Sequence, residues 1–339
     1  MYLIFLIILK LCFLNQIFSR TKSANSISHF KDTLFIVKYN YDTPINQILL
    51  HFNLWNSVFI NQFISGPFNS LKIEQLRGML PKVFNTYISS CIDDDFKGYY
   101  AYASVLNAMK LFPHFKGYLF AHDDMAINIT SLMQFDLSTV WITENDFRGY
   151  TLRNIDLQSS VYKKGEHIWG WLHKPCGSEA IERLIQKDEY IRLKIKHCTG
   201  SDKVWYSGQS DFFYIPQNYY PVFVDVLGKF IKEKIFLELA IPTFVECFVN
   251  KLSFDQRKSK VSLIEKIPIF RIRLCEYWSG NRENISYLEP RCITYRHSLI
   301  HPLKLSRGTP TLNLMIKKMD VNLNLNSILN LYNLTKILY

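Results

Sequence analysis

The fold of this chain is decided by residues 117 to 125, Gly-Tyr-Leu-Phe-Ala-His-Asp-Asp-Met. The first five are a strand-sized apolar run, and two adjacent aspartates follow one residue later. A short apolar run bounded by polar residues is typical of a buried strand. A helical pattern from Tyr99 to Leu111 precedes it and ends before Pro113. We therefore expect an αβ unit that brings two carboxylates to the carboxyl end of a strand, the edge where open α/β sheets bind ligands.

The segments on either side repeat this alternation. Residues 33 to 40 read as a buried strand that ends in polar residues, Pro44 opens a helix with apolar positions at helical spacing, and residues 58 to 64 read as a second strand. Further strands are expected at 139–143 and 211–216, and further helices at 178–185 and over most of 219–248. The pattern predicts an α/β fold with a mixed, mainly parallel sheet flanked by helices and a helical C-terminal part.

Composition excludes several classes of protein. The chain has 339 residues, of which 48% are hydrophobic, so it can bury a large core and is not intrinsically disordered. Its net charge of +11 favours anionic partners such as nucleotides or sugar phosphates. We find no basic helix, zinc-finger spacing or aromatic RNA-binding motif, so no nucleic-acid partner is expected.

The N-terminal residues point to the secretory pathway. Residues 1–19 are an apolar run that fits a signal peptide or a signal anchor, with cleavage near Ser19 preferred over membrane anchoring and an N-terminal core element as the alternative. Residues 20–32 are polar and read as a short stem. The folded domain is then expected over 33–305, followed by a tail, 306–339, of uncertain order.

The cysteines fit an oxidising compartment. Of seven in the chain, Cys12 lies in the signal segment, and the remaining six permit up to three disulfides with the pairing left open. No Cys-x-x-Cys pair occurs, so a structural zinc site is not expected.

Two adjacent carboxylates after a buried strand have a specific chemistry. Asp123 and Asp124 repel each other unless a cation or a proton lies between them. Mg²⁺ or Mn²⁺ takes oxygen ligands and also binds phosphates, so such a pair can stabilise a diphosphate leaving group. This chemistry is glycosyl transfer from a sugar nucleotide. The alternative is a solvated Asp-Asp turn or a helix cap.

Other residues supply the remaining functions of a sugar transfer. An inverting transfer needs a carboxylate base, for which Asp211 and Glu238 are the candidates, each with a structural alternative as a cap or an outward-facing residue. Trp169 and Trp171 are candidate substrate residues, because their flat apolar faces can contact a sugar ring, although core packing explains most aromatics.

These segments resemble a known family. Residues 97–124 resemble the helix, strand and acidic DxD-type signature of nucleotide-sugar glycosyltransferases with the GT-A fold. More closely, the chain is similar to the STELLO-type glycosyltransferase-like family of plants and invertebrates. The segments that carry this similarity are 117–125, 169–177, 210–216, 236–243 and 301–306.

The resemblance implies roles for individual residues. Asp123 and Asp124 would hold a metal ion, Mn²⁺ or Mg²⁺, or the donor's ribose and phosphates, and His301 would supply a C-terminal metal ligand. The residues in positions that cradle the nucleotide in GT-A enzymes are Tyr39, Asn40 and Lys97. The chain departs from the family pattern at His122, which stands at the first acidic place of the DxD motif.

The expected protein is a glycosyltransferase of the Golgi lumen that uses a nucleotide-sugar donor and a glycan or glycoprotein acceptor. Asn128 begins a glycosylation tripeptide, but a glycan so close to the acidic pair would block the donor. One alternative is a metal-dependent nuclease or phosphatase, which lacks its usual additional acidic and histidine motifs. Another is a catalytically inactive luminal scaffold or regulator of a glycan synthase, which the altered DxD motif favours.

Overall fold

The computed structural model describes residues 29–40, 43–56, 58–80, 85–90, 99–145, 153–156, 177–250, 269–276 and 299–301. The chain divides into two compact units, which are described separately below. The first unit contains residues 1–90, 122–135 and 273–339, and the second contains 91–121 and 136–272. The N-terminal segment 1–19, the tail 306–339, Lys97, Trp169 and Trp171 lie outside the described residues.

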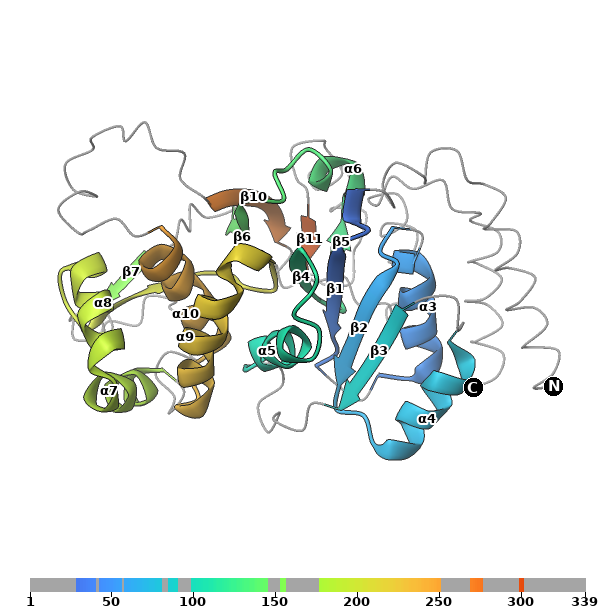
Figure 1. The fold of residues 1–339 in the computed structure, drawn as a ribbon, viewed down its shortest axis with the longest axis horizontal. Coiled ribbons are helices and arrows are strands. Elements are labelled where there is room, and N and C mark those ends of the chain that lie inside the picture. Colours follow the sequence, from blue (N-terminus) through green and yellow to red (C-terminus); the bar gives the residue numbers. More distant parts are fainter. Residues whose placement is uncertain are drawn as a thin grey trace. The chain divides into compact units, whose positions relative to one another are not determined.

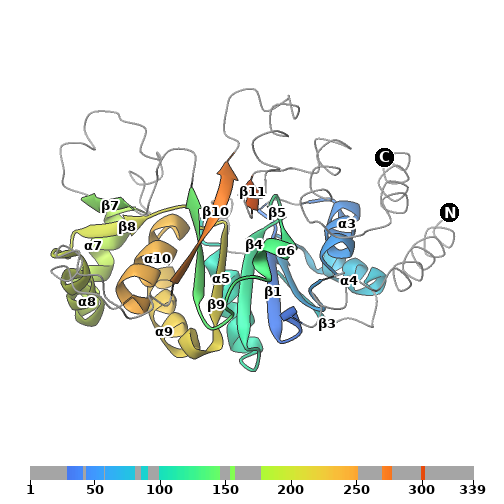
Figure 2. The ribbon, with the colours of Figure 1, turned by 90° about the horizontal axis from the view of Figure 1, so that it is seen from above.

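The first unit begins with three parallel strands. They are β1 (Thr33–Lys38), β2 (Asn61–Gly66) and β3 (Asn85–Ser90), with β2 paired to both others. Helix α3 (Ile45–Asn56) connects β1 to β2, and α4 (Ser70–Met79) connects β2 to β3. Figures 1 and 2 show these helices, in blue, beside the strands. The strand–helix–strand alternation thus has the parallel geometry that the sequence predicts.

A second strand group completes the described part of this unit. Strand β10 (Ile269–Glu276), whose first four residues belong to the second unit, pairs in parallel with β11 (Leu299–His301), which pairs antiparallel with the short β5 (Ala126–Ile127). Helix α6 (Ile129–Leu132) follows β5, and the Asn128 side chain caps it by accepting a hydrogen bond of 2.9 Å from the Ser131 N–H. Asn128 therefore has a local structural role.

The second unit is built on antiparallel strands. Strand β4 (Gly117–His122), which runs into the first unit at its last residue, pairs with β9 (Phe212–Pro216), and β9 pairs with β6 (Val140–Asn145). A separate two-stranded antiparallel sheet joins β7 (Arg153–Asp156) to β8 (Val204–Ser207). A β-carbon at Gly117 would overlap the Tyr214 hydroxyl of β9, so glycine is required where β4 begins.

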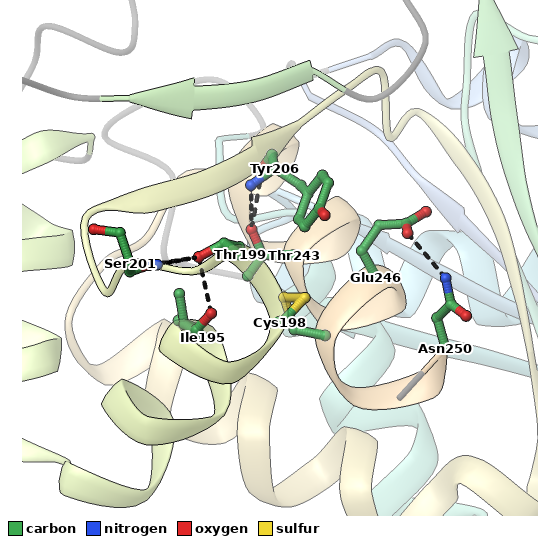
Figure 3. The surroundings of a disulfide bond; sticks show 9 residues. Ile195, Cys198, Thr199, Ser201, Tyr206, Thr243, Glu246 and Asn250 are labelled. Atoms are coloured by element: carbon green, nitrogen blue, oxygen red, sulfur yellow. Dashed lines mark hydrogen bonds between the residues drawn. A yellow bond between two sulfur atoms is a disulfide. The ribbon is translucent and has the colours of Figure 1, made fainter. Parts of the chain in front are cut away.

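Several helical elements accompany these strands in the described part of this unit. They are α5 (Tyr102–Leu111), α7 (Ser178–Lys187), α8 (Glu189–Thr199), α9 (Tyr220–Lys232), α10 (Leu237–Phe244) and the π-helix η3 (Val245–Val249), with a 3₁₀ turn η2 (Gln217–Tyr219) before α9. A disulfide joins Cys198 at the end of α8 to Cys247 in η3, as Figure 3 shows. It is one of the bonds that the six expected luminal cysteines permit.

Each unit has an aromatic core. In the first, Phe35 of β1 stacks on Phe59 with ring centroids 4.3 Å apart and also contacts Trp55 of α3. In the second, Phe120 of β4 stacks on Phe213 of β9 at 4.8 Å. The apolar runs of the sequence are therefore buried strands, as their length and flanking polar residues predict.

The predicted fold class is confirmed: the chain is α/β, with a mixed sheet and flanking helices, consistent with a GT-A-like fold. The predicted elements at 33–40, 58–64, 117–121, 139–143, 178–185 and 211–216 correspond to β1, β2, β4, β6, α7 and β9 within a few residues. Among the described residues, no helix is both long enough and apolar enough to cross a bilayer.

Candidate functional site

The acidic pair lies in a tight turn directly after β4. The Asp123 N–H donates a hydrogen bond of 3.1 Å to the carbonyl of Lys38, the last residue of β1, and the Met125 N–H donates to the His122 carbonyl at 3.3 Å. Both aspartates are half-buried. The backbone of β1 therefore fixes the position at which the carboxylates leave the strand.

Tyr39 and His51 form a buried polar couple in the same unit. Tyr39 follows β1, its N–H donates to the Ser65 carbonyl at 2.8 Å, and its side chain is 1% exposed. His51 lies in the middle of α3 and is 3% exposed. The Tyr39 hydroxyl and His51 Nδ1 share a hydrogen bond of 3.1 Å. The predicted nucleotide-site residue Tyr39 is thus held by a helix that the sequence did not connect with it.

Electrostatics couple this pair to the aspartates. Burial raises the pKa of the Tyr39 hydroxyl well above its ordinary value, and the Asp123 charge adds to the rise. Burial lowers the pKa of His51 to about 4, against the opposing effect of the Asp124 charge. Both side chains are therefore neutral near pH 7. Neither adds a positive charge that would compete with a metal ion for the carboxylates.

Two polar atoms near this couple have no hydrogen-bond partner within the described part of the chain. They are the Asn40 side-chain oxygen, at the end of the β1 segment, and His51 Nε2. Buried polar groups are usually paired, and an unpaired one costs about 1–3 kcal/mol. Such exceptions are enriched where a ligand or a functional strain replaces the missing partner.

His301 reaches this region through the strand register. Strand β11 pairs Leu299 with Ile127 and Ile300 with Ala126. The next residue of β11, His301, therefore falls opposite Met125 in the backbone register, one position beyond Asp124. The topology brings the backbone of the expected C-terminal metal ligand to the acidic turn.

The donor atoms of the acidic turn fit a hard divalent cation. Within the described ranges, no group of three or more His, Cys, Asp or Glu side chains is placed to hold a metal. Mg²⁺-type sites commonly use one or two protein carboxylates, with water and substrate phosphates completing the shell. Asp123 and Asp124 would supply those carboxylates.

The candidate base Asp211 lies in a pinned loop of the second unit, residues 208–211. The Gly208 N–H donates to the Glu238 carbonyl at 3.0 Å, and the Thr143 hydroxyl donates to the Gln209 carbonyl. Because Phe212 pairs with Ala121, this loop lies at the carboxyl end of β4. The loop therefore relates the two candidate bases: Asp211 is part of it, and the Glu238 backbone holds it.

Glu238 and Gln209 are two further polar residues at this loop. Glu238 lies in the first turn of α10 and is half-buried. Both side-chain amide atoms of Gln209 are buried with no hydrogen-bond partner among the described residues. Sequence reasoning passed over Gln209, because a glutamine beside a strand gives no sign of whether its amide will be satisfied.

Two further residues, Trp205 and Lys38, are fully buried. Trp205, an aromatic residue near Asp211 in the sequence, is fully buried and its Nε1–H donates to the Asp202 carbonyl at 3.2 Å, so it packs in the core. Lys38 was missed by the sequence analysis and is completely buried at the end of β1. A lysine that ends an otherwise apolar strand was the available signal.

The chain is similar to a known protein over much of its length. It is 20% identical over 221 residues to the probable glycosyltransferase STELLO1 of Arabidopsis thaliana. The aligned part is 63% of this chain and 27% of that protein, so the chain spans about a quarter of the curated relative's length. No protein-family model matches the chain. The similarity supports a glycosyltransferase-like relationship.

Proposed function

We propose that the protein is a glycosyltransferase of the secretory pathway that transfers a sugar from a nucleotide-sugar donor to a glycan or protein acceptor. In this proposal Asp123 and Asp124 hold a divalent cation, Mn²⁺ or Mg²⁺, and the donor diphosphate. The supporting observation is the acidic turn itself: two half-buried carboxylates after β4, tied by the Asp123 N–H to the end of β1 and bordered by neutral Tyr39 and His51.

The proposed chemistry follows from these residue types. A bound divalent cation would supply positive charge to stabilise the diphosphate leaving group. In an inverting transfer, Asp211 or Glu238 would take the proton of the acceptor hydroxyl while its oxygen bonds to the anomeric carbon and the bond to the diphosphate breaks. Asn40, with its unmet buried oxygen, would bind the donor from the end of β1, and His301 would join the cation ligands.

The proposed compartment has separate support. Disulfides persist in oxidising environments such as the secretory pathway, and the described part of the chain contains the Cys198–Cys247 disulfide. Together with the apolar N-terminal segment it favours a luminal protein, and we place it in the Golgi. The N-terminal segment would enter the pathway as a signal peptide or a membrane anchor.

The test is turnover of a donor panel. The full chain is incubated with UDP- and GDP-sugars, Mn²⁺ and a panel of glycan and glycoprotein acceptors, and release of the nucleoside diphosphate is measured. We expect release with at least one donor, loss of release with EDTA, and a fall of about 100-fold or more in Asp124→Asn. Asp202→Asn, a matched change in a turn of the second unit, should retain full activity. Release that survives both EDTA and Asp124→Asn contradicts the proposal.

A second candidate function is an inactive luminal scaffold that regulates a glycan synthase. It is favoured by His122 at the first acidic place of the motif. The same panel separates the two: nucleotide binding without turnover for any donor or acceptor supports the scaffold, and cation-dependent release supports the enzyme.

A further inference from the structure

We propose that His51 is a positioning residue for the acidic turn, acting through the Tyr39 hydroxyl on the backbone that holds Asp123. This inference rests on the proposed function of the Asp123–Asp124 pair as a cation and diphosphate site. It assigns a role to a side chain of α3 that does not itself belong to the turn.

Two hydrogen bonds, joined by the backbone of residues 38–39, connect His51 to the acidic turn. His51 Nδ1 is 3.1 Å from the Tyr39 hydroxyl. Tyr39 follows Lys38 directly, and the Lys38 carbonyl accepts the Asp123 N–H at 3.1 Å. The segment 38–39 is therefore fixed at three points: by α3 through the side chain, by the Ser65 carbonyl of β2, and by the backbone of the acidic turn.

Burial makes this connection stiff. Tyr39, His51 and Lys38 are 1%, 3% and 0% exposed, so water cannot readily replace a lost partner. Tyr39 also lies against Phe68, with ring centroids 5.9 Å apart, which limits the directions in which its ring can move. A change at Nδ1 is therefore expected to move the end of β1 rather than only the side chain.

The couple also carries a cost that packing alone does not explain. His51 Nε2 is buried with no partner among the described residues, whereas Leu at 51 together with Phe at 39 would fill a similar space without an unmet polar atom. The charges of both aspartates reach the couple, Asp123 at Tyr39 and Asp124 at His51. Residues behind a metal or phosphate site that orient its ligands typically change affinity by 10–100-fold when replaced.

Three substitutions test the geometry. Asparagine places an amide near the position of Nδ1, where it can donate to or accept from Tyr39, whereas glutamine places its amide near Nε2, and leucine removes both. We expect His51→Asn to bind Mn²⁺·UDP within about 2-fold of wild type, and His51→Gln and His51→Leu to bind at least about 10-fold more weakly. Titration calorimetry on the full chain measures these affinities.

A double substitution tests the route through Tyr39. Tyr39→Phe should weaken Mn²⁺·UDP binding about as much as His51→Leu, and the double variant should be no weaker than either single one, because both break the same connection. Additive losses would mean that His51 acts by another route. Equal affinity in every folded variant would overturn the proposal while leaving the function of the acidic pair intact.

A measurement without ligand keeps the two proposals separable. Hydrogen–deuterium exchange at the Asp123 amide and in residues 38–40 should become at least about 10-fold faster in His51→Gln and remain near wild type in His51→Asn. If the wild type fails to bind Mn²⁺·UDP, the proposed function fails, and this exchange result still decides whether His51 positions the turn. Unchanged exchange in His51→Gln contradicts the positioning role.

Discussion

The acidic turn of the first unit and the helices of the second unit differ in whether their polar side chains have hydrogen-bond partners. Around the turn, Asn40 and His51 each leave a buried polar atom without a partner in the described part of the chain. In the helices, Asp188 caps α8 through the Ile191 N–H at 2.9 Å and pairs with Lys229 at 3.0 Å. The unpaired atoms of the first region lower the free energy of unfolding, whereas the paired groups of the second region raise it.

The same contrast holds for the rest of the helical region. The Lys187 ammonium group donates a hydrogen bond of 2.8 Å to the Glu233 carboxylate. The Thr243 hydroxyl accepts from the Tyr206 N–H and donates to the Tyr206 carbonyl, each at 3.1 Å, as Figure 3 shows. The Cys198–Cys247 disulfide joins α8 to η3 in the same region. Regions that bind ligands commonly tolerate unmet groups that a purely structural region does not. This difference predicts that substitutions in the two regions will act on different properties.

The largest effect is expected from the disulfide. Replacing Cys198 and Cys247 together by alanine releases a closure spanning 49 residues, and the loop-entropy relation gives a loss of about 4 kcal/mol in the free energy of unfolding. Chemical denaturation of the double variant and of the wild type measures it. A loss below about 1 kcal/mol would contradict this difference between the two regions, because the bond would then contribute little stability.

The next effect is a pH dependence from His51. Its pKa is lowered from 6.5 to about 4 in the folded chain, so between these values the unfolded chain binds a proton that the folded chain does not. Stability therefore falls as the pH drops from 6.5 to 4, by about 3 kcal/mol from this residue. Denaturation at pH 7 and pH 4 should show a smaller fall in His51→Asn. An equal fall in both proteins would mean that His51 does not cause it.

A smaller loss is expected at the start of α8. Asp188→Ala removes a helix cap and an ion pair and should cost about 1–2 kcal/mol, whereas Asp188→Asn keeps the cap and should lose less than about 1 kcal/mol. Thermal denaturation of the two variants compares them. Equal losses would assign the effect to the ion pair rather than to the cap, and would show that this helix is held by charge.

The smallest expected effect has the opposite sign. Gln209→Leu replaces a buried amide whose two polar atoms have no partner among the described residues, and it should raise the free energy of unfolding by about 1 kcal/mol. Gln209→Glu, of the same shape, should lower it because the charge would be buried. A loss of stability in Gln209→Leu would place Gln209 with the satisfied network of the second unit.

The sequence predicts the fold well where local patterns are strong. The strands at 33–38 and 117–122 and the helix at 45–56 follow from apolar runs, a proline start and helical spacing. Helix α4 was missed because only Leu76 of its ten residues is buried, so its amphipathic pattern is weak. Local signals suffice when the buried face is continuous.

Helix α8 shows how a pattern can mislead. Residues 191–196, Ile-Arg-Leu-Lys-Ile-Lys, alternate as a strand would, yet they are helical and leave Leu193 52% exposed. The Asp188 cap at one end and Gly200, in the left-handed conformation with φ 83°, at the other end fix the helix. End signals here outweigh the alternating pattern.

The site was only partly accessible from the sequence. The acidic pair is predicted from its place after a strand and Tyr39 from the family resemblance, but the link from Tyr39 to His51 depends on how α3 lies against β1. A histidine on a helix that is largely buried gives no sign of its partner. The same limit applies to the loop at 208–211, whose Gln209 amide is unmet only because of tertiary packing.

The central claim is that the carboxylates of Asp123 and Asp124 hold a nucleoside diphosphate through a divalent cation. Titration calorimetry of UDP into the full chain, with and without Mn²⁺, tests it most directly. We expect binding that requires Mn²⁺ and weakens at least about 10-fold in Asp124→Asn, with no change in Asp202→Asn. UDP binding of equal affinity without the cation, or in Asp124→Asn, would contradict it.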